Sequence, residues 1–184
     1  MKKRCTWTGD DPLMIKYHDE EWGVPIKDDR KIFEFIVLEG AQAGLSWKTV
    51  LHKREGYRKA FSNFDFKKIS KYNEKDIERL MKNPKIIRNR LKILSAINNA
   101  KKFIELKKEF SSFENYLKKF VKKRIVNDIK TLKDIPSRTH LSDEISQDLK
   151  KRGFKFMGST IVYAHMQATG IVDDHVNDCF KKKK

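Results

Sequence analysis

Apolar residues recur at helical spacing along almost the whole of this 184-residue chain, which narrows the folds it can adopt. Amphipathic stripes with this spacing run through 32–37, 47–61, 87–104 and 113–121. Two patterns are typical of helix starts, Ser111 followed by Glu114 and Asn73 followed by Asp76. With eight glycines and no run of alternating apolar and polar residues, an extended sheet is not expected. We therefore predict one all-α domain, a helical bundle, over residues 1–184.

The chain is strongly basic, with a formal net charge of +17 from 42 Lys+Arg against 25 Asp+Glu. Such a surface attracts polyanions such as nucleic acid, although lysines on helix faces are often simply solvated. We expect the lysine run at 181–184 to be a disordered tail. No stretch approaches the roughly 18 apolar residues of a membrane span, and the first residues do not resemble a secretory signal. We expect a soluble, cytoplasmic protein with no membrane partner.

The two cysteines lie near opposite ends of the chain, and each has a histidine in its neighbourhood. His175 and Cys179 are four residues apart, so on a helix their side chains would share a face. Cys5 and His18 have no such periodic relation. Three interpretations stay open on spacing alone: a Cys₂His₂ zinc site that ties the termini together, free thiols beside unrelated histidines, and a disulfide. The absence of secretory features disfavours the disulfide.

The segment 142–170 has the pattern of two helices joined by a tight turn with a glycine at each end. Gly153 can take a positive φ and end the first helix. Gly158 lets the backbone approach a phosphate before the second helix presents its free N–H groups. A helix-hairpin-helix unit of this kind grips a DNA backbone without reading sequence. An ordinary helical hairpin with Phe154 and Phe156 in the core fits the same residues.

A carboxylate stands where apolar side chains are expected. Glu39 follows Phe35 by four residues and Ile36 by three, which places it on the apolar face of its helix. A buried carboxylate is costly, so it should have a partner or a function. Gly40 leaves space beside it, and Trp47 can cover the same space, so the pattern favours an acidic, aromatic pocket for a flat, cationic or hydrogen-bond-donating ligand. The alternative is a frayed helix end that exposes Glu39 to solvent.

Aromatic residues gather in the segment that also carries Cys5 and His18. Trp7, Tyr17 and Trp22 lie there, and Trp22 is expected in the core. Metal ligation would explain how an arm with so little helical periodicity holds a shape. Such a zinc ion would be structural, because four protein ligands leave no open position for water.

Three longer segments carry a resemblance to a known family: YHDEEWGVP at 17–25, LEGAQAGLSW at 38–47 and RGFKFMG at 152–158. In this order and register, from about Cys5 to Cys179, the chain resembles the bacterial 3-methyladenine DNA glycosylase I family. The resemblance implies a helix-hairpin-helix DNA repair fold. It also implies an enzyme that flips a damaged adenine out of the duplex and hydrolyses its N-glycosidic bond.

The resemblance assigns the metal and base-binding residues. The family's zinc ligands match Cys5, His18, His175 and Cys179, a clip that joins 5–18 to 175–179. Its pocket residues match Trp7, Tyr17, Glu39 and Trp47. The aromatic rings would stack on the extruded cationic base, while Glu39 accepts hydrogen bonds from the base edge, stabilises the developing sugar cation or orients the attacking water. We favour base recognition as its first role. Met14 stands where relatives often carry tyrosine, so one wall is expected to be less aromatic.

The resemblance also implies how DNA is held and how far the reaction goes. Adenine methylated at N3 is cationic and leaves readily, so little acid catalysis is needed. Relatives that also cleave the strand carry a lysine where this chain has Thr160, so we expect no Schiff base and a monofunctional enzyme that leaves an abasic site. The expected DNA contacts are a wedge formed by Gln42, Gly44 and Leu45, the hairpin residues Gly153, Lys155, Gly158, Ser159 and Thr160, and phosphate contacts from Arg88 and Arg90.

Two rival functions compete with this interpretation. A non-enzymatic, zinc-stabilised DNA-binding module would have no need of Glu39 and its aromatic wall. A nucleobase deaminase would need His-x-Glu and Pro-Cys-x-x-Cys patterns, which are missing. We expect a monomer that acts on double-stranded DNA with alkylated bases and releases free 3-methyladenine. Whether 3-methylguanine is also accepted stays open.

Overall fold

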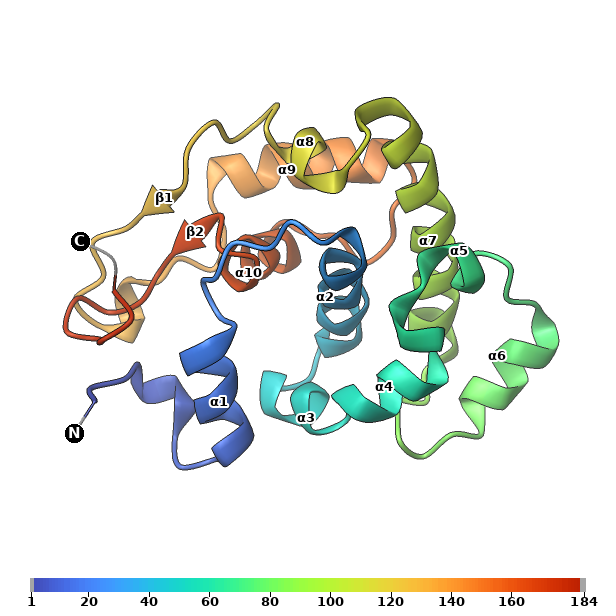
Figure 1. Cartoon of the computed structure of the whole chain (residues 1–184), viewed down its shortest axis with the longest axis horizontal. Helices are drawn as coiled ribbons and strands as arrows, with labels where there is room; N and C mark the ends of the chain where they lie inside the picture. Colours follow the sequence, from blue (N-terminus) through green and yellow to red (C-terminus); the bar gives the residue numbers. More distant parts are fainter. Residues whose placement is uncertain (1, 183–184) are drawn as a thin grey trace.

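The computed structural model describes residues 2–182 and is almost entirely helical (Figure 1). The α-helices are α1 (Pro12–Glu20), α2 (Asp29–Gln42), α3 (Trp47–His52), α4 (Arg54–Ala60), α5 (Phe66–Ile69), α6 (Glu74–Met81), α7 (Arg90–Phe110), α8 (Phe113–Leu117), α9 (His140–Lys151) and α10 (Ser159–Ala168). Three 3₁₀ turns are η1 (Thr6–Thr8), η2 (Ser62–Phe64) and η3 (Leu132–Asp134). Strands β1 (Ile125–Val126) and β2 (Val172–Asp173) form one short parallel pair. None of the helices within 2–182 has the length and apolar character that a membrane crossing requires.

Helix α2 lies at the centre of the bundle and packs against α3, α7, α8 and α10 (Figure 1). Its predicted apolar stripe is confirmed, since Ile32, Phe33 and Ile36 are almost completely buried. Burial of such side chains is the main favourable contribution to folding. The mostly helical fold predicted from the sequence is therefore confirmed, with a central helix that carries Glu39 near its C-terminal end.

The apolar stripe predicted over 87–104 is only partly confirmed on α7. Ile97 is buried, whereas Leu91 and Leu94, apolar residues of the same segment, are 68% and 38% exposed. The buried face consists of Ile93, Ala96, Ile97, Ala100, Phe103 and Leu106. The prediction relied on large apolar residues. The buried face also contains Ala96 and Ala100, small residues that allow neighbouring helices to pack closely.

Of the two predicted helix starts, one is confirmed and one is displaced. Asn73 caps α6 in a capping box with Asp76. Ser111, however, has φ +69° and ends α7, and Ser112 caps α8 by accepting a hydrogen bond from the backbone N–H of Asn115 at 3.0 Å. Adjacent serines are equivalent as caps, so the choice between them depends on where α7 stops.

Helices α9 and α10 pack against each other through the turn that contains Gly153, whose φ of +87° confirms the predicted helix end. Phe154 is buried in the core. The turn is held from outside by Asn99 of α7, which exchanges two 2.8 Å hydrogen bonds with the backbone of Lys155. From within, the Ser146 hydroxyl donates to the carbonyl of Met157 at 2.7 Å. The hairpin is thus fixed by satisfied backbone groups.

The N-terminal arm, formed by η1 and α1, lies beside the C-terminal segment that follows β2 (Figure 1). An almost fully buried guanidinium joins this arm to the bundle. Arg54 donates from Nη1 to Glu21 at 2.7 Å and from Nε to Glu34 at 2.8 Å. These charges stabilise the fold only as a set, because each would be costly alone.

The lysine run at the end of the chain begins against the body of the protein. Lys181 donates from Nζ to the carbonyl of Asp19 at 2.8 Å, and the backbone N–H of Lys182 donates to the carbonyl of Cys179 at 3.0 Å. Residues 183–184, the rest of the predicted disordered tail, lie outside the described residues.

We predict that Arg54→Ala lowers the free energy of unfolding by about 3 kcal/mol, because Glu21 and Glu34 lose their shared cation in a buried site. Urea denaturation measures this change. The control is Arg30→Ala, which removes a half-exposed guanidinium 3.5 Å from Asp65 and should cost less than about 1 kcal/mol. Equal losses for the two variants would contradict a special role for the buried pair.

Candidate functional site

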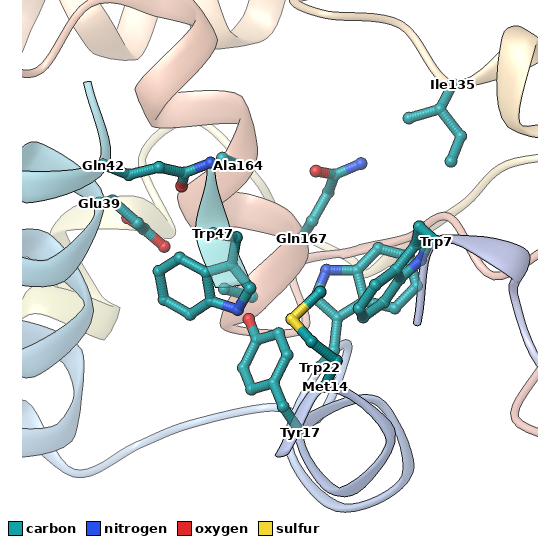
Figure 2. A pocket seen from close by; sticks show the side chains of 11 residues that line it. Trp7, Met14, Tyr17, Trp22, Glu39, Gln42, Trp47, Ile135, Ala164 and Gln167 are labelled. Carbon is teal, nitrogen blue, oxygen red and sulfur yellow. The ribbon is translucent and has the colours of Figure 1, made fainter. Parts of the chain in front are cut away.

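A cavity of about 300 Å³ opens between the N-terminal arm, the α2–α3 connection and α10 (Figure 2). It is lined by Trp7, Met14, Tyr17, Trp22, Glu39, Gln42, Trp47, Ile135, Ala164, Gln167 and Ala168. The four residues predicted to bind the base are therefore all in its wall. They come from four elements, η1, α1, α2 and α3, so the cavity exists only when the arm is docked on the bundle.

Glu39 is 3% exposed, and α2 continues to Gln42, which excludes the frayed-end alternative. Its Oε2 lies 2.8 Å from Nδ1 of His165 on α10. Its Oε1 is buried and has no hydrogen-bond partner among the described residues. Burial raises the pKa of Glu39, and the neighbouring His165 opposes that rise. A carboxylate with one occupied and one free oxygen is an incomplete site, which a hydrogen-bond donor in the cavity would complete.

Aromatic side chains form much of the cavity wall, with Trp47 nearest to Glu39 and Trp7 and Trp22 across the cavity from it (Figure 2). The rings of Tyr17 and Trp47 lie 5.2 Å apart, and those of Trp7 and Trp22 lie 5.1 Å apart, nearly edge to face. Burial, and then the charge of Glu39, raises the pKa of Tyr17 well above its usual value, so its hydroxyl stays protonated. The indole N–H groups of Trp7 and Trp47 are buried without partners in the described part of the chain. The walls therefore offer flat apolar faces and a few unsatisfied donors.

The sequence analysis missed two polar residues of α10. One is His165, the partner of Glu39. The other is Gln167, which lines the cavity and donates from Nε2 to Asp174 at 2.7 Å. Asp174 also accepts from the hydroxyl of Tyr163 at 2.7 Å, so Gln167 is held in place. His165 could have been found by the argument that found Glu39, because it follows Val162 by three residues on an apolar helix face. Gln167 gave no comparable signal.

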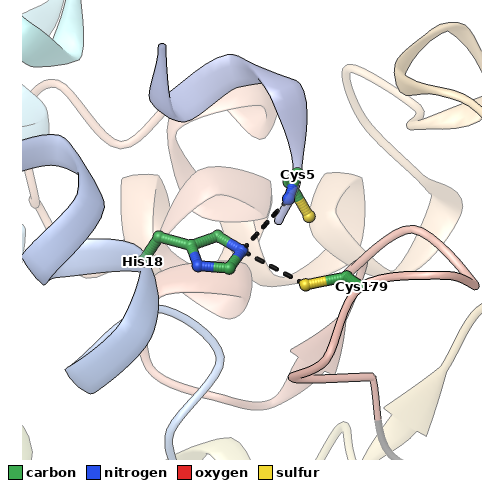
Figure 3. A group of neighbouring side chains, drawn as sticks. All are labelled: Cys5, His18 and Cys179. Atoms are coloured by element: carbon green, nitrogen blue, oxygen red, sulfur yellow. Dashed lines mark hydrogen bonds between the residues drawn. The ribbon is translucent and has the colours of Figure 1, made fainter. Parts of the chain in front are cut away.

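Cys5, His18 and Cys179 come together as predicted (Figure 3). One ligand atom from each lies within 4.8 Å of the others, and His18 Nε2 is 3.4 Å from Cys179 Sγ. The cysteines are free thiols, so the disulfide interpretation is wrong. His175 does not join this group, but its ring lies 5.1 Å from that of His18 and its Nε2 is buried without a partner in residues 2–182.

Both histidines are oriented by carboxylates. Nδ1 of His18 lies 2.8 Å from Asp19, which in turn accepts hydrogen bonds from Nε and Nη2 of Arg4. Nδ1 of His175 lies 2.8 Å from Asp173. An Nδ1–H that donates to a carboxylate leaves the Nε2 lone pair free, which is how metal-binding histidines are commonly held. The geometry of these residues is therefore suited to a cation.

The residues predicted to form a wedge lie beside the cavity. Gln42 lines it, whereas Gly44 and Leu45 are exposed in the loop between α2 and α3. Lys92 holds this loop by donating from Nζ to the carbonyls of Ala41 and Ala43 at 2.8 and 2.6 Å. A second cavity of about 190 Å³ is lined by both this loop and the start of α10, so the wedge and the hairpin helix are neighbours.

The predicted DNA contacts of the hairpin and of the 88–90 segment differ in accessibility. Lys155 and Thr160 are exposed, and Gly158 has open space where a side chain would stand. Ser159 is half-buried, and its hydroxyl lies 2.8 Å from that of Ser142. Two arginines were also predicted to contact phosphates. Arg88 is exposed, whereas Arg90 is paired with Glu74 at 2.6 Å.

Comparison with known proteins gives the family. The chain matches the model of the methyladenine glycosylase family over residues 7–182. It belongs to this family. It is 49% identical to the DNA-3-methyladenine glycosylase of Haemophilus influenzae over 180 residues, 97% of each protein. A crystal structure of a 3-methyladenine DNA glycosylase I superposes with a TM-score of 0.95 at 48% identity, covering 98% of this chain and 100% of the other.

A further member of the family was solved to show the structural basis of 3-methyladenine recognition, the 3-methyladenine DNA glycosylase I of Staphylococcus aureus. It superposes with a TM-score of 0.94 at 34% identity, covering 98% of this chain and 97% of that one. The predicted resemblance is thus confirmed over essentially the full length of the chain.

We predict that Glu39→Gln is more stable than the wild type at neutral pH. The folded-state pKa of Glu39 is raised above its unfolded value, so folding loses stability as pH rises from near 4.5 through the folded pKa. Glutamine does not ionise and escapes this loss. Urea unfolding between about pH 4 and pH 8 should show a stability difference that widens with pH. A wild type that gains stability over the variant across this range would contradict the burial argument.

Proposed function

We propose that this protein is a DNA-3-methyladenine glycosylase that extrudes the alkylated base and hydrolyses its N-glycosidic bond. One observation carries the proposal. Glu39 is a buried carboxylate whose free Oε1 belongs to the wall of an aromatic cavity of about 300 Å³. The relatives described above, which act on or recognise 3-methyladenine, support the same conclusion.

The cavity suits a cationic purine better than a neutral one. Methylation at N3 gives adenine a positive charge, which the faces of Tyr17 and Trp47 attract by cation–π interaction. Oε1 of Glu39 would accept a hydrogen bond from the base edge and oppose the same charge at short range in a poorly solvated site. Because the charged base is already a good leaving group, selective binding does most of what catalysis requires. The same carboxylate would stabilise the sugar cation that forms as the bond breaks.

We infer that DNA is gripped by the hairpin and opened by the loop between α2 and α3. The exposed Leu45 and the adjacent Gln42 would fill the gap left by the flipped base. Gly158 and the N-terminus of α10 would hold a phosphate, with Lys155 nearby. Thr160 offers no amine for a Schiff base, so the product is an abasic site and free 3-methyladenine. We further propose that the protein acts as a monomer on double-stranded DNA, in the cytoplasm.

We further propose that Cys5, His18, Cys179 and His175 hold a structural zinc ion. The donor set fits: two thiols, an Nε2 from His18, and a buried Nε2 from His175 that otherwise lacks a partner. Burial raises the pKa of the Cys5 thiol to about 12, and a bound cation would reverse this by stabilising the thiolate. Zinc would tie the arm that carries Trp7 and Tyr17 to the C-terminal segment and would take no part in the reaction.

We predict that Glu39→Gln lowers the single-turnover release of 3-methyladenine from methylated duplex DNA by at least about 100-fold, because the variant lacks the opposing charge. Chromatography of the released base measures it. The control, Glu105→Gln, removes an exposed carboxylate from α7 and should leave the rate unchanged. DNA binding without base release by the wild type would favour the non-enzymatic DNA-binding module instead.

We predict that Cys179→Ser loses bound zinc and unfolds at a lower temperature, because the metal links two distant segments. Metal analysis and thermal unfolding of the same sample test this. Activity should fall in step with the loss of folded protein. Loss of activity with metal content and thermal stability unchanged would contradict a structural site.

A further inference from the structure

Glu39 has a partner that its expected role did not include. His165 is 2% exposed and lies on α10, the second helix of the hairpin, so the contact joins the candidate catalytic group to the element expected to grip DNA. Its Nδ1 is 2.8 Å from Oε2 of Glu39 and is the only hydrogen-bond partner of that carboxylate among the described residues.

The ring of His165 is fixed by packing. Phe113 of α8 stands edge-on to it, with ring centroids 5.8 Å apart at 79°. His165 also lines a separate cavity of about 200 Å³, called here the rear cavity. Its Nε2 is buried without a partner in the described structure. Among the described residues, the His165 ring therefore makes its hydrogen bond through Nδ1 alone.

Charged groups approach the pair from several elements. The rear cavity is lined by Lys27, Lys118, Lys122, Lys123 and Arg124, with Glu114, which is paired with Lys118 at 3.0 Å. Tyr17 faces Glu39 from α1, and Lys92 from α7 lies at the C-terminal end of α2. An ionised carboxylate has no proton to give, so Nδ1 carries the hydrogen and Oε2 accepts it.

We propose that His165 is a positioning residue for base excision, whose Nδ1–H holds Oε2 of Glu39 so that Oε1 is presented to the extruded base. This proposal rests on the proposed function. The contact also stabilises the ionised form of a carboxylate whose pKa burial raises. Oε2 of Glu39 is therefore bound by the protein, and Oε1 is left to bind the ligand.

Two substitutions separate positioning from mere packing. Asparagine carries its Nδ2 on the same atom that bears Nδ1 in histidine, so His165→Asn can keep the donor, whereas His165→Leu cannot. We expect His165→Leu to lower the single-turnover excision rate about tenfold at neutral pH and to shift the acidic limb of the pH–rate profile to higher pH. The rate of His165→Asn should stay within about threefold of the wild type. KM should change little in either variant.

The control is Met166→Leu, which alters the buried face of α10 one residue further on and removes no hydrogen bond. Circular dichroism and thermal unfolding establish that each variant is folded before its rate is compared. In a folded background, a leucine variant with the wild-type rate and pH profile would overturn the proposal. So would a folded asparagine variant as slow as the leucine variant.

A second readout does not depend on activity. The pKa of Glu39 can be followed from its carboxyl ¹³C signal, assigned by its absence in Glu39→Gln. It should rise in His165→Leu and stay near the wild-type value in His165→Asn, because only the first loses the donor. If the wild type released no 3-methyladenine, the proposed function would fail, yet these shifts would still confirm or refute the contact. An unchanged pKa in the leucine variant would refute it.

Discussion

A carboxylate removed from water must be protonated, hydrogen-bonded or opposed by a cation, and Glu39 imposes that requirement on the centre of this fold. Its Oε2 meets His165, and its Oε1 meets no group in the described residues. The protein thus tolerates a half-satisfied charge in its interior. A site that lowers stability in the free protein and is completed by a cationic ligand is typical of binding and catalytic centres.

The aromatic walls of this site depend on a segment with little packing of its own. Trp7 and Tyr17 come from the N-terminal arm. Arg54 ties the end of α1 to α2, and the cysteine–histidine group joins the arm to the C-terminal segment. Within the arm, Asp19 links Arg4 to His18. The proposed metal ion would therefore act on the base pocket only through the position of the arm.

Much of this arrangement could be predicted from the sequence, for reasons that differ between elements. The stripe of α2 identified both the central helix and its buried carboxylate, because Phe35 and Ile36 lie one turn before Glu39 on the same apolar face. The face of α7 could not be assigned in the same way, since its buried face includes two alanines, whereas Leu91 and Leu94 are exposed. Ser111 and Ser112 were equivalent caps until the end of α7 was known.

The arrangement of the polar residues of the site could also be predicted only in part. Spacing suggested the cysteine–histidine group, but only the fold brings Cys5 and Cys179 together and leaves His175 beside them. The pairing of Glu39 with His165 joins residues 126 positions apart, and no periodicity encodes such a contact. The resemblance to the glycosylase family supplied the pocket residues of η1, α1 and α3, whereas Gln167 became visible only in three dimensions.

The central claim is that a negative carboxylate in an aromatic cavity selects a positively charged purine. It is tested most directly by single-turnover excision of 3-methyladenine and of the neutral base hypoxanthine from matched duplexes, with each rate divided by its uncatalysed rate. The account predicts a rate enhancement at least about 100-fold larger for the cationic base, and a much smaller difference in Glu39→Gln. Equal enhancements for the two bases in the wild type would contradict it.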